Sequence, residues 1–206
     1  MPSRQYYELR QFQLRNGYSE NPAPTVRPPT AGNVGLFNPV IGGNGPYLLM
    51  LLTYASFAEA ERIDESAVGY VRYDRTILRA FSGMPELRLP PASSPGHIFE
   101  LRTYESNNAA SLAKKIDMFN HGEMQIFERL GMHPVFFGEA LIGSRLPHLS
   151  YMLAFDDLAA RERLWKTFAA DPEWLALRST PGLSDAEIVS NIQTTILRPL
   201  AISDIR

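Results

Sequence analysis

The sequence predicts an α+β protein, in which two ferredoxin-like β-α-β-β-α-β repeats form an α+β barrel and the first repeat is depleted in helix. One observation behind this prediction is the tripeptide ELR. It occurs at 8–10 and again at 100–102, each time inside an alternating run typical of a β-strand. A second observation is that residues 34–62 align without a gap with residues 135–163. Self-similarity along a chain indicates a duplicated unit, so we expect the strands of the two repeats to match.

The second repeat shows all of its elements in order. Alternating apolar and polar side chains indicate strands, and apolar residues three and four apart indicate helices. Gly131 is suited to end a helix, Asp171 followed by proline to restart one, and Ser184 with Glu187 to form a capping box. The predicted elements are a strand at 98–105, a helix at 109–130, strands at 134–142 and 148–155, a helix from about 157 that restarts at 171–173, a short turn at 184–187 and a strand at 191–198.

The first repeat carries the same strands but less helix. Its first helix is replaced by the proline-rich stretch 21–30, where proline removes amide donors and blocks a helix. Its second helix is short, at about 57–66. The strands are predicted at 5–14, 33–41, 47–54 and 69–79.

The chain therefore divides into a degenerate repeat at 1–82, a proline-rich linker at 83–96 and a complete repeat at 97–206. A four-stranded sheet with helices on one face leaves its other face bare, and two such sheets bury that face by packing together. We expect this pairing within the chain. We also expect a homo-oligomer, most simply a dimer, because the first repeat has few helices to cover its apolar surface.

Composition and charge exclude several classes of protein. The 206 residues carry a net charge of -2 with no basic run, which argues against a nucleic-acid partner. The absence of cysteine excludes disulfides and thiolate-ligated zinc. The longest apolar run, about 47–52, is far shorter than the ~20 residues that span a bilayer, and the first residues lack the pattern of a signal peptide. We therefore predict a cytoplasmic protein with no membrane span.

Five short stretches of the second repeat occur in a specific combination: IFELRTY (98–104), GEMQIFERLG (122–131), PVFFGE (134–139), YMLAFDDLAARE (151–162) and DPEW (171–174). With them the sequence resembles the NIPSNAP family, part of the dimeric α+β barrel superfamily, over the second repeat and more weakly over the strands of the first. The resemblance implies the barrel, the tandem arrangement and a dimer-like assembly. It implies no established reaction, since relatives in the superfamily include cofactor-free monooxygenases, haem-binding enzymes and small lactone-pathway isomerases.

Glu123 is the unusual residue of the helix predicted at 109–130, because it lies on the apolar stripe between Ile116 and Leu130. A carboxylate on a core-facing stripe is paired, protonated or at the edge of a pocket. The functional hypothesis makes Glu123 a catalytic acid or base, with His133 reaching the same cleft from the next strand. The alternative is a partly exposed glutamate bonded to a neighbour such as Arg129.

Five further side chains are candidates for binding a ligand in that cleft. Arg102 would anchor a carboxylate, Tyr104 would orient a substrate, and Trp165 would wall an apolar pocket. Because ELR occurs in both repeats, cross-strand Glu–Arg pairing inside a closed barrel is the preferred interpretation of Arg102, and anchoring a ligand carboxylate is the alternative. The full set is Arg102, Tyr104, His121, Glu139 and Trp165.

Four histidines without paired spacing predict no dedicated metal site, and the sequence calls for no cofactor. The preferred function is a NIPSNAP-like barrel that binds a small apolar ligand or acts as a protein-interaction scaffold. The alternative is a cofactor-independent monooxygenase or isomerase acting on a small apolar substrate in the C-terminal repeat. Haem binding is a second alternative.

Overall fold

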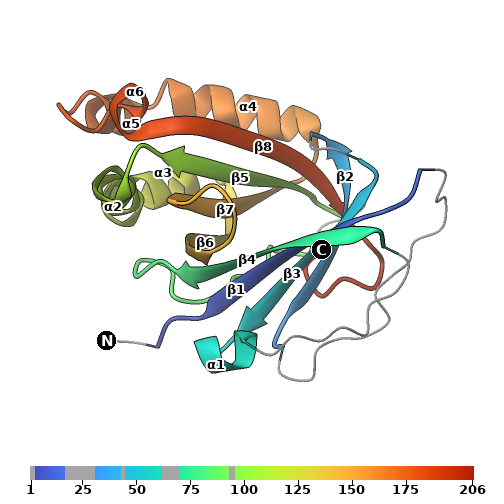
Figure 1. Cartoon of the computed structure of the whole chain (residues 1–206). Coiled ribbons are helices and arrows are strands. Elements are labelled where there is room, and N and C mark those ends of the chain that lie inside the picture. The colour runs from blue at the N-terminus through green and yellow to red at the C-terminus, as the bar shows by residue number, and fades with distance from the viewer. Residues whose placement is uncertain (1–2, 17–30, 43–44, 62–69, 93–95) are drawn as a thin grey trace.

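A computed structural model describes residues 3–16, 31–42, 45–61, 70–92 and 96–206. Its eight strands close a barrel in the order β1-β3-β2-β8-β5-β7-β6-β4 (Figure 1). Each strand lies within a few residues of its predicted position. The strands are β1 (Tyr6–Gln13), β2 (Val34–Ile41), β3 (Tyr47–Tyr54), β4 (Arg72–Ala80), β5 (Ile98–Ser106), β6 (His133–Ile142), β7 (His148–Phe155) and β8 (Val189–Pro199).

All neighbouring strands are antiparallel, and each repeat contributes four adjacent ones. The repeats join where β2 pairs with β8 and where β4 pairs with β6. The two sheets are therefore continuous at both edges, and the predicted pairing within the chain is confirmed. Pairing between chains stays a prediction.

The predicted helix at 109–130 is confirmed, but it contains one wider turn. It runs as α2 (Ala109–Met118), a π-helical turn η1 (Phe119–Glu123) and α3 (Met124–Arg129), and Gly131 ends it with a positive φ of 78°. Gly122 lets this turn lie close to a neighbouring helix, because a Cβ there would stand 2.9 Å from Leu177. A π-turn inserts one residue and rotates the following side chains about the helix axis.

Two of the remaining helices begin at the caps predicted for them, Asp171 and Ser184. The Asp171 side chain accepts hydrogen bonds from the amides of Glu173 and Trp174, and Ser184 with Glu187 forms the capping box. The remaining helices are α1 (Phe57–Ala60), α4 (Leu158–Ala169), α5 (Pro172–Arg178) and α6 (Asp185–Ile188). None of the helices in the described ranges is long and apolar enough to cross a membrane.

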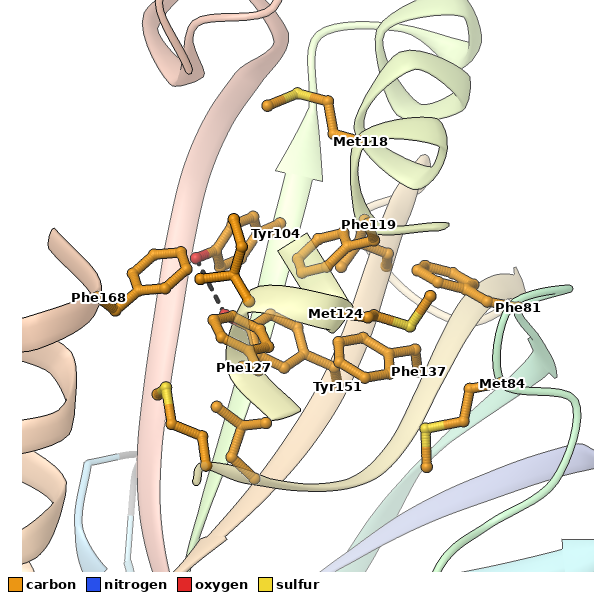
Figure 2. Close-up of a cluster of buried hydrophobic side chains, with 14 of the residues drawn as sticks. Phe81, Met84, Tyr104, Met118, Phe119, Met124, Phe127, Phe137, Tyr151 and Phe168 are labelled. Carbon is orange, nitrogen blue, oxygen red and sulfur yellow. Dashed lines mark hydrogen bonds between the residues drawn. The ribbon is translucent and has the colours of Figure 1, made fainter. Parts of the chain in front are cut away.

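The core has three layers. The barrel interior is filled by side chains from both repeats, such as Phe37, Phe99 and Met152. The outer face of the second repeat is buried under helices α2 to α5, with Phe119, Phe127 and Tyr151 in a cluster of aromatic rings (Figure 2). In the residues described for the first repeat, its outer face has a smaller cluster and one short helix, α1 (Figure 1).

The described part of the predicted linker, 83–92, contains neither helix nor strand and bonds to both repeats. The amide of Gln5 donates to the Pro85 carbonyl, and the amide of Arg88 donates to the Val135 carbonyl. Leu87 packs against the barrel-interior cluster, as does the buried Ile205 near the C-terminus. The rest of the linker, the proline-rich stretch 21–30 and the end of the helix predicted at 57–66 lie outside the described residues.

Candidate functional site

Glu123 lies at the end of the π-turn and is 2% exposed. Its Oε2 accepts a hydrogen bond from the Lys115 Nζ at 3.1 Å. Arg129, the partner proposed from the sequence, binds Asp171 instead. Glu123 is therefore paired, as one of the two interpretations expected, but it is buried rather than partly exposed, and its partner is a lysine eight residues before it instead of an arginine six residues after it.

Lys115 is fully buried and stands between two carboxylates, since its Nζ also lies 3.1 Å from Asp185 Oδ1. The rings of Tyr104, Phe119 and Trp174 surround the ammonium at 5.1 to 5.4 Å. Burial lowers the pKa of Lys115, but Glu123 and Asp185 outweigh burial and hold that pKa above its usual value. Its charge is therefore fixed, which suits a structural cation rather than a proton carrier.

Arg102 and Tyr104 lie on the same outer face of β5, beneath the helices. The Arg102 guanidinium stacks on the Trp165 ring at 4.5 Å, and the Tyr104 hydroxyl lies 3.2 Å from that of Tyr151 (Figure 2). Glu–Arg pairing does occur on this face, since Arg102 Nη1 lies 3.8 Å from Glu100 Oε1. Its predicted place inside the barrel is wrong, because this face of β5 packs under the helices. Glu100 accepts hydrogen bonds from Arg161 and Trp165 of α4, not chiefly from Arg102.

The first repeat holds the equivalent carboxylate in a similar way with different residues. Glu8 is fully buried and accepts hydrogen bonds from Arg10, Arg75 and Tyr54. Arg75 comes from β4, whereas Arg161, its counterpart beside Glu100, comes from a helix. Two different elements thus supply a second guanidinium to the same strand position, which indicates a structural role for both networks.

The other predicted residues do not join Glu123. The register places His133 beside Ala154, level with Phe99 and five residues along the sheet from Tyr104, or about 17 Å. The ring of His133 packs near that of His97 instead. His121 is exposed and pairs with Asp117, and Glu139 pairs with Arg79. The structure brings together Glu123, Arg102, Tyr104 and Trp165, and leaves His121, His133 and Glu139 apart.

A cavity of about 490 Å³ lies inside the barrel, on the opposite face of β5 from Arg102. It opens at the end of the barrel that contains the β6–β7 hairpin, and both repeats line it. Positions that match in the repeat alignment face each other across it. The matched pairs are Leu9/Leu101, Gln11/Thr103, Tyr47/His148, Leu49/Ser150, Asp74/Gln193 and Thr76/Thr195.

The wall from the second repeat is cross-linked by its own polar groups. The hydroxyls of Thr103 and Ser150 lie 2.8 Å apart. Arg145 reaches Glu105 and Gln193, each at 3.1 Å. Arg145 adopts a left-handed backbone with φ of 56°, a conformation that costs energy for a residue with a Cβ and clusters at functional sites. The polar side chains of this wall are therefore held in place before any ligand arrives.

This pocket was not predicted from the sequence, although one signal points to it. The inward residues of β5 change from apolar to polar along the strand, from Phe99 and Leu101 to Thr103 and Glu105. Inward residues of a barrel that is packed throughout would stay apolar. Polar residues at inward positions near one end of several strands therefore indicate an open, hydrated end.

Two buried histidines make the stability depend on pH. Burial lowers the pKa of His97 and that of His148 below the usual 6.5, although Asp156 opposes this at His97 and the Arg145 carbonyl and Glu105 at His148. The unfolded chain then takes up protons first as the pH falls below about 6.5, so the free energy of unfolding decreases. We expect a lower Tm at pH 5.5 than at pH 7.5, and a smaller decrease in the double variant His97→Gln/His148→Gln. Circular dichroism measures both, and equal decreases would contradict the assignment.

Comparison with known proteins agrees with this architecture. A family model described as NIPSNAP matches residues 99–204. A NIPSNAP-like domain protein from Burkholderia xenovorans is 20% identical over 52% of this chain and 89% of its own, with a TM-score of 0.47. A putative monooxygenase from Lactobacillus acidophilus is 9% identical over 95% and 94%, with a TM-score of 0.62. One from Fusobacterium nucleatum is 6% identical over 98% and 95%, with a TM-score of 0.61. The last two share the whole fold. No curated protein matches the chain.

Proposed function

The chain belongs to the NIPSNAP family, and from that premise we propose that it binds a small polar molecule in the pocket at the open end of its barrel. The observation that supports this proposal is the convergence of matching positions from both repeats on one cavity of about 490 Å³. Known ligand sites have volumes of about 300–1,000 Å³. The binding role is the one expected from the sequence, but the polar lining favours a polar ligand over an apolar one.

The pocket combines an apolar floor with polar walls. Leu9, Leu49 and Leu101 form apolar surface, and hydroxyl, amide, carboxylate and imidazole groups surround it. Small-molecule sites are usually lined mainly by apolar side chains with a few polar groups that fix orientation, and this pocket is richer in polar groups than that, which suits a polar ligand. On the helix-covered face of the second repeat, by contrast, the described aromatic and charged side chains contact one another.

The test fills the pocket with an indole. Gln193→Trp places the ring inside the barrel, whereas Ile192→Trp places it outside, because Ile192 is the exposed neighbour whose side chain points the other way. Fragments that bind the wild type in a ligand-observed NMR screen are expected to lose at least about tenfold in affinity in Gln193→Trp. They should keep their affinity in Ile192→Trp. Equal binding to all three proteins would refute the pocket as the site.

A second candidate function is cofactor-independent catalysis in the same pocket. His148 favours it, since burial keeps the pKa of this imidazole low and leaves it neutral, as a proton acceptor must be. Proteins of the same fold that are described as putative monooxygenases are consistent with it. Chemical conversion of a bound fragment, absent in His148→Gln, distinguishes an enzyme from a binding protein.

A further inference from the structure

We propose that the ligand of this pocket carries a cationic nitrogen, which docks between the carboxylate of Asp74 and the amide oxygen of Gln11. The inference rests on the proposed function, because it names the chemical class that the same pocket selects.

The two residues form one docking point. Gln11 on β1 and Asp74 on β4 are direct partners in the antiparallel register, and both line the cavity. Side chains of directly opposed residues start about 5 Å apart and reach the same point in space. Together they present three oxygen acceptors, and a primary ammonium has three N–H donors.

In the described part of the chain, neither side chain has a hydrogen-bond or ion-pair partner. The opposite wall differs, because Glu105 there forms an ion pair with Arg145 and accepts a hydrogen bond from Asn191. The Gln11 amide and the Asp74 carboxylate are thus free for a ligand, whereas the Oε1 atoms of Glu105 and Gln193 are already engaged.

The charge of the lining favours a cation. Glu105 and Arg145 neutralise each other at 3.1 Å, which leaves Asp74 as the uncompensated charge of the pocket. An anionic ligand would meet net repulsion and would have to break the Glu105–Arg145 pair to reach the guanidinium. A cation meets Asp74 without breaking any contact in the described part of the chain.

The match between the two repeats fails at Gln11 and Asp74. The residues that match Gln11 and Asp74 in the second repeat are Thr103 and Gln193, and neither carries a charge. Only one wall therefore attracts a cation, so a ligand binds in one orientation. Its body lies over Leu49 and Leu101, which form the apolar floor.

Three probes of one shape and different charge test the inference. They are 2-phenylethylamine, 2-phenylethanol and phenylacetate, titrated by NMR into the wild type, Asp74→Asn and Asp117→Asn. Asp117 is an exposed aspartate on a helix outside the pocket, so its substitution removes the same charge elsewhere. The wild type is expected to bind the amine at least about fivefold more tightly than the alcohol, which is the affinity difference that one partly solvated charge pair can supply. It should bind the carboxylate most weakly.

Asp74→Asn should abolish the preference for the amine without weakening the alcohol, and Asp117→Asn should change neither. Because the pair is near solvent, the preference should also shrink as salt is raised. Binding of the alcohol to the wild type but not to Gln193→Trp would support the binding function. If the amine is then not preferred, or if Asp74→Asn keeps the preference for it, the cation assignment is wrong and the binding function stands. If none of the three probes saturates, both are overturned.

Discussion

Replacing Lys115 with alanine is expected to lower the free energy of unfolding by about 3–5 kcal/mol. The substitution leaves Glu123 buried without its cation, in a layer of aromatic rings that admits little water. It also removes the contacts of the lysine with Tyr104, Phe119 and Trp174. Breaking one side of a buried ion pair costs more than the pair contributes, because the remaining charge keeps its full desolvation penalty. Urea denaturation followed by tryptophan fluorescence measures the change.

The matched control is the double variant Lys115→Met/Glu123→Gln, which removes both charges and keeps the volume. It should recover at least half of the lost stability, since a neutral pair of similar size carries no Born penalty. Asp185→Asn should cost less than about 1 kcal/mol, because that carboxylate is 43% exposed. If Lys115→Ala and Asp185→Asn cost the same, the ammonium is hydrated and the buried-pair interpretation fails.

The fold was predictable because its signals are local. Strand alternation, the cap at Asp171 and the capping box at Ser184 each depend on a few neighbouring residues, and all of them appear where expected. The repeat alignment added the tertiary information, since two units with matching strands close into one barrel. The π-turn was not predictable, because apolar periodicity tolerates one extra residue within a helix.

The candidate site was harder to predict, since alternation separates the two faces of a strand without showing which one is inside. Glu100 and Arg102 share a face, and the sequence assigned it to the barrel interior, whereas the helices cover it. Thr103 and Glu105 on the other face were left without a function for the same reason. Glu123 was recognised as buried, but Lys115 was not, because a lysine among helix-surface residues gives no local sign that its end is enclosed.

Removing the repeated carboxylate should affect the two repeats unequally, although ELR is the same in both. Glu8→Ala is expected to cost about 3–5 kcal/mol, because Arg10 beside it has a side chain only 5% exposed and cannot reach water. Glu100→Ala is expected to cost about 2 kcal/mol, because Arg161 is 28% exposed and can turn outward when its partner is lost. Urea denaturation of the two single variants measures the difference.

Glu139→Ala provides the control for losing a glutamate from a strand. Its pair with Arg79 is about one-third exposed on both sides, and such pairs contribute about 1 kcal/mol or less. The loss of unfolding free energy should therefore be largest for Glu8→Ala, smaller for Glu100→Ala and smallest for Glu139→Ala. Adding Arg10→Met to Glu8→Ala should restore part of the stability, because it removes the buried guanidinium that has lost its ion pair with Glu8. If Glu100→Ala costs more stability than Glu8→Ala, or if Arg10→Met lowers the stability further, burial of the guanidinium does not determine the stability loss. The ion-pair networks around Glu8 and Glu100 would then not be equivalent.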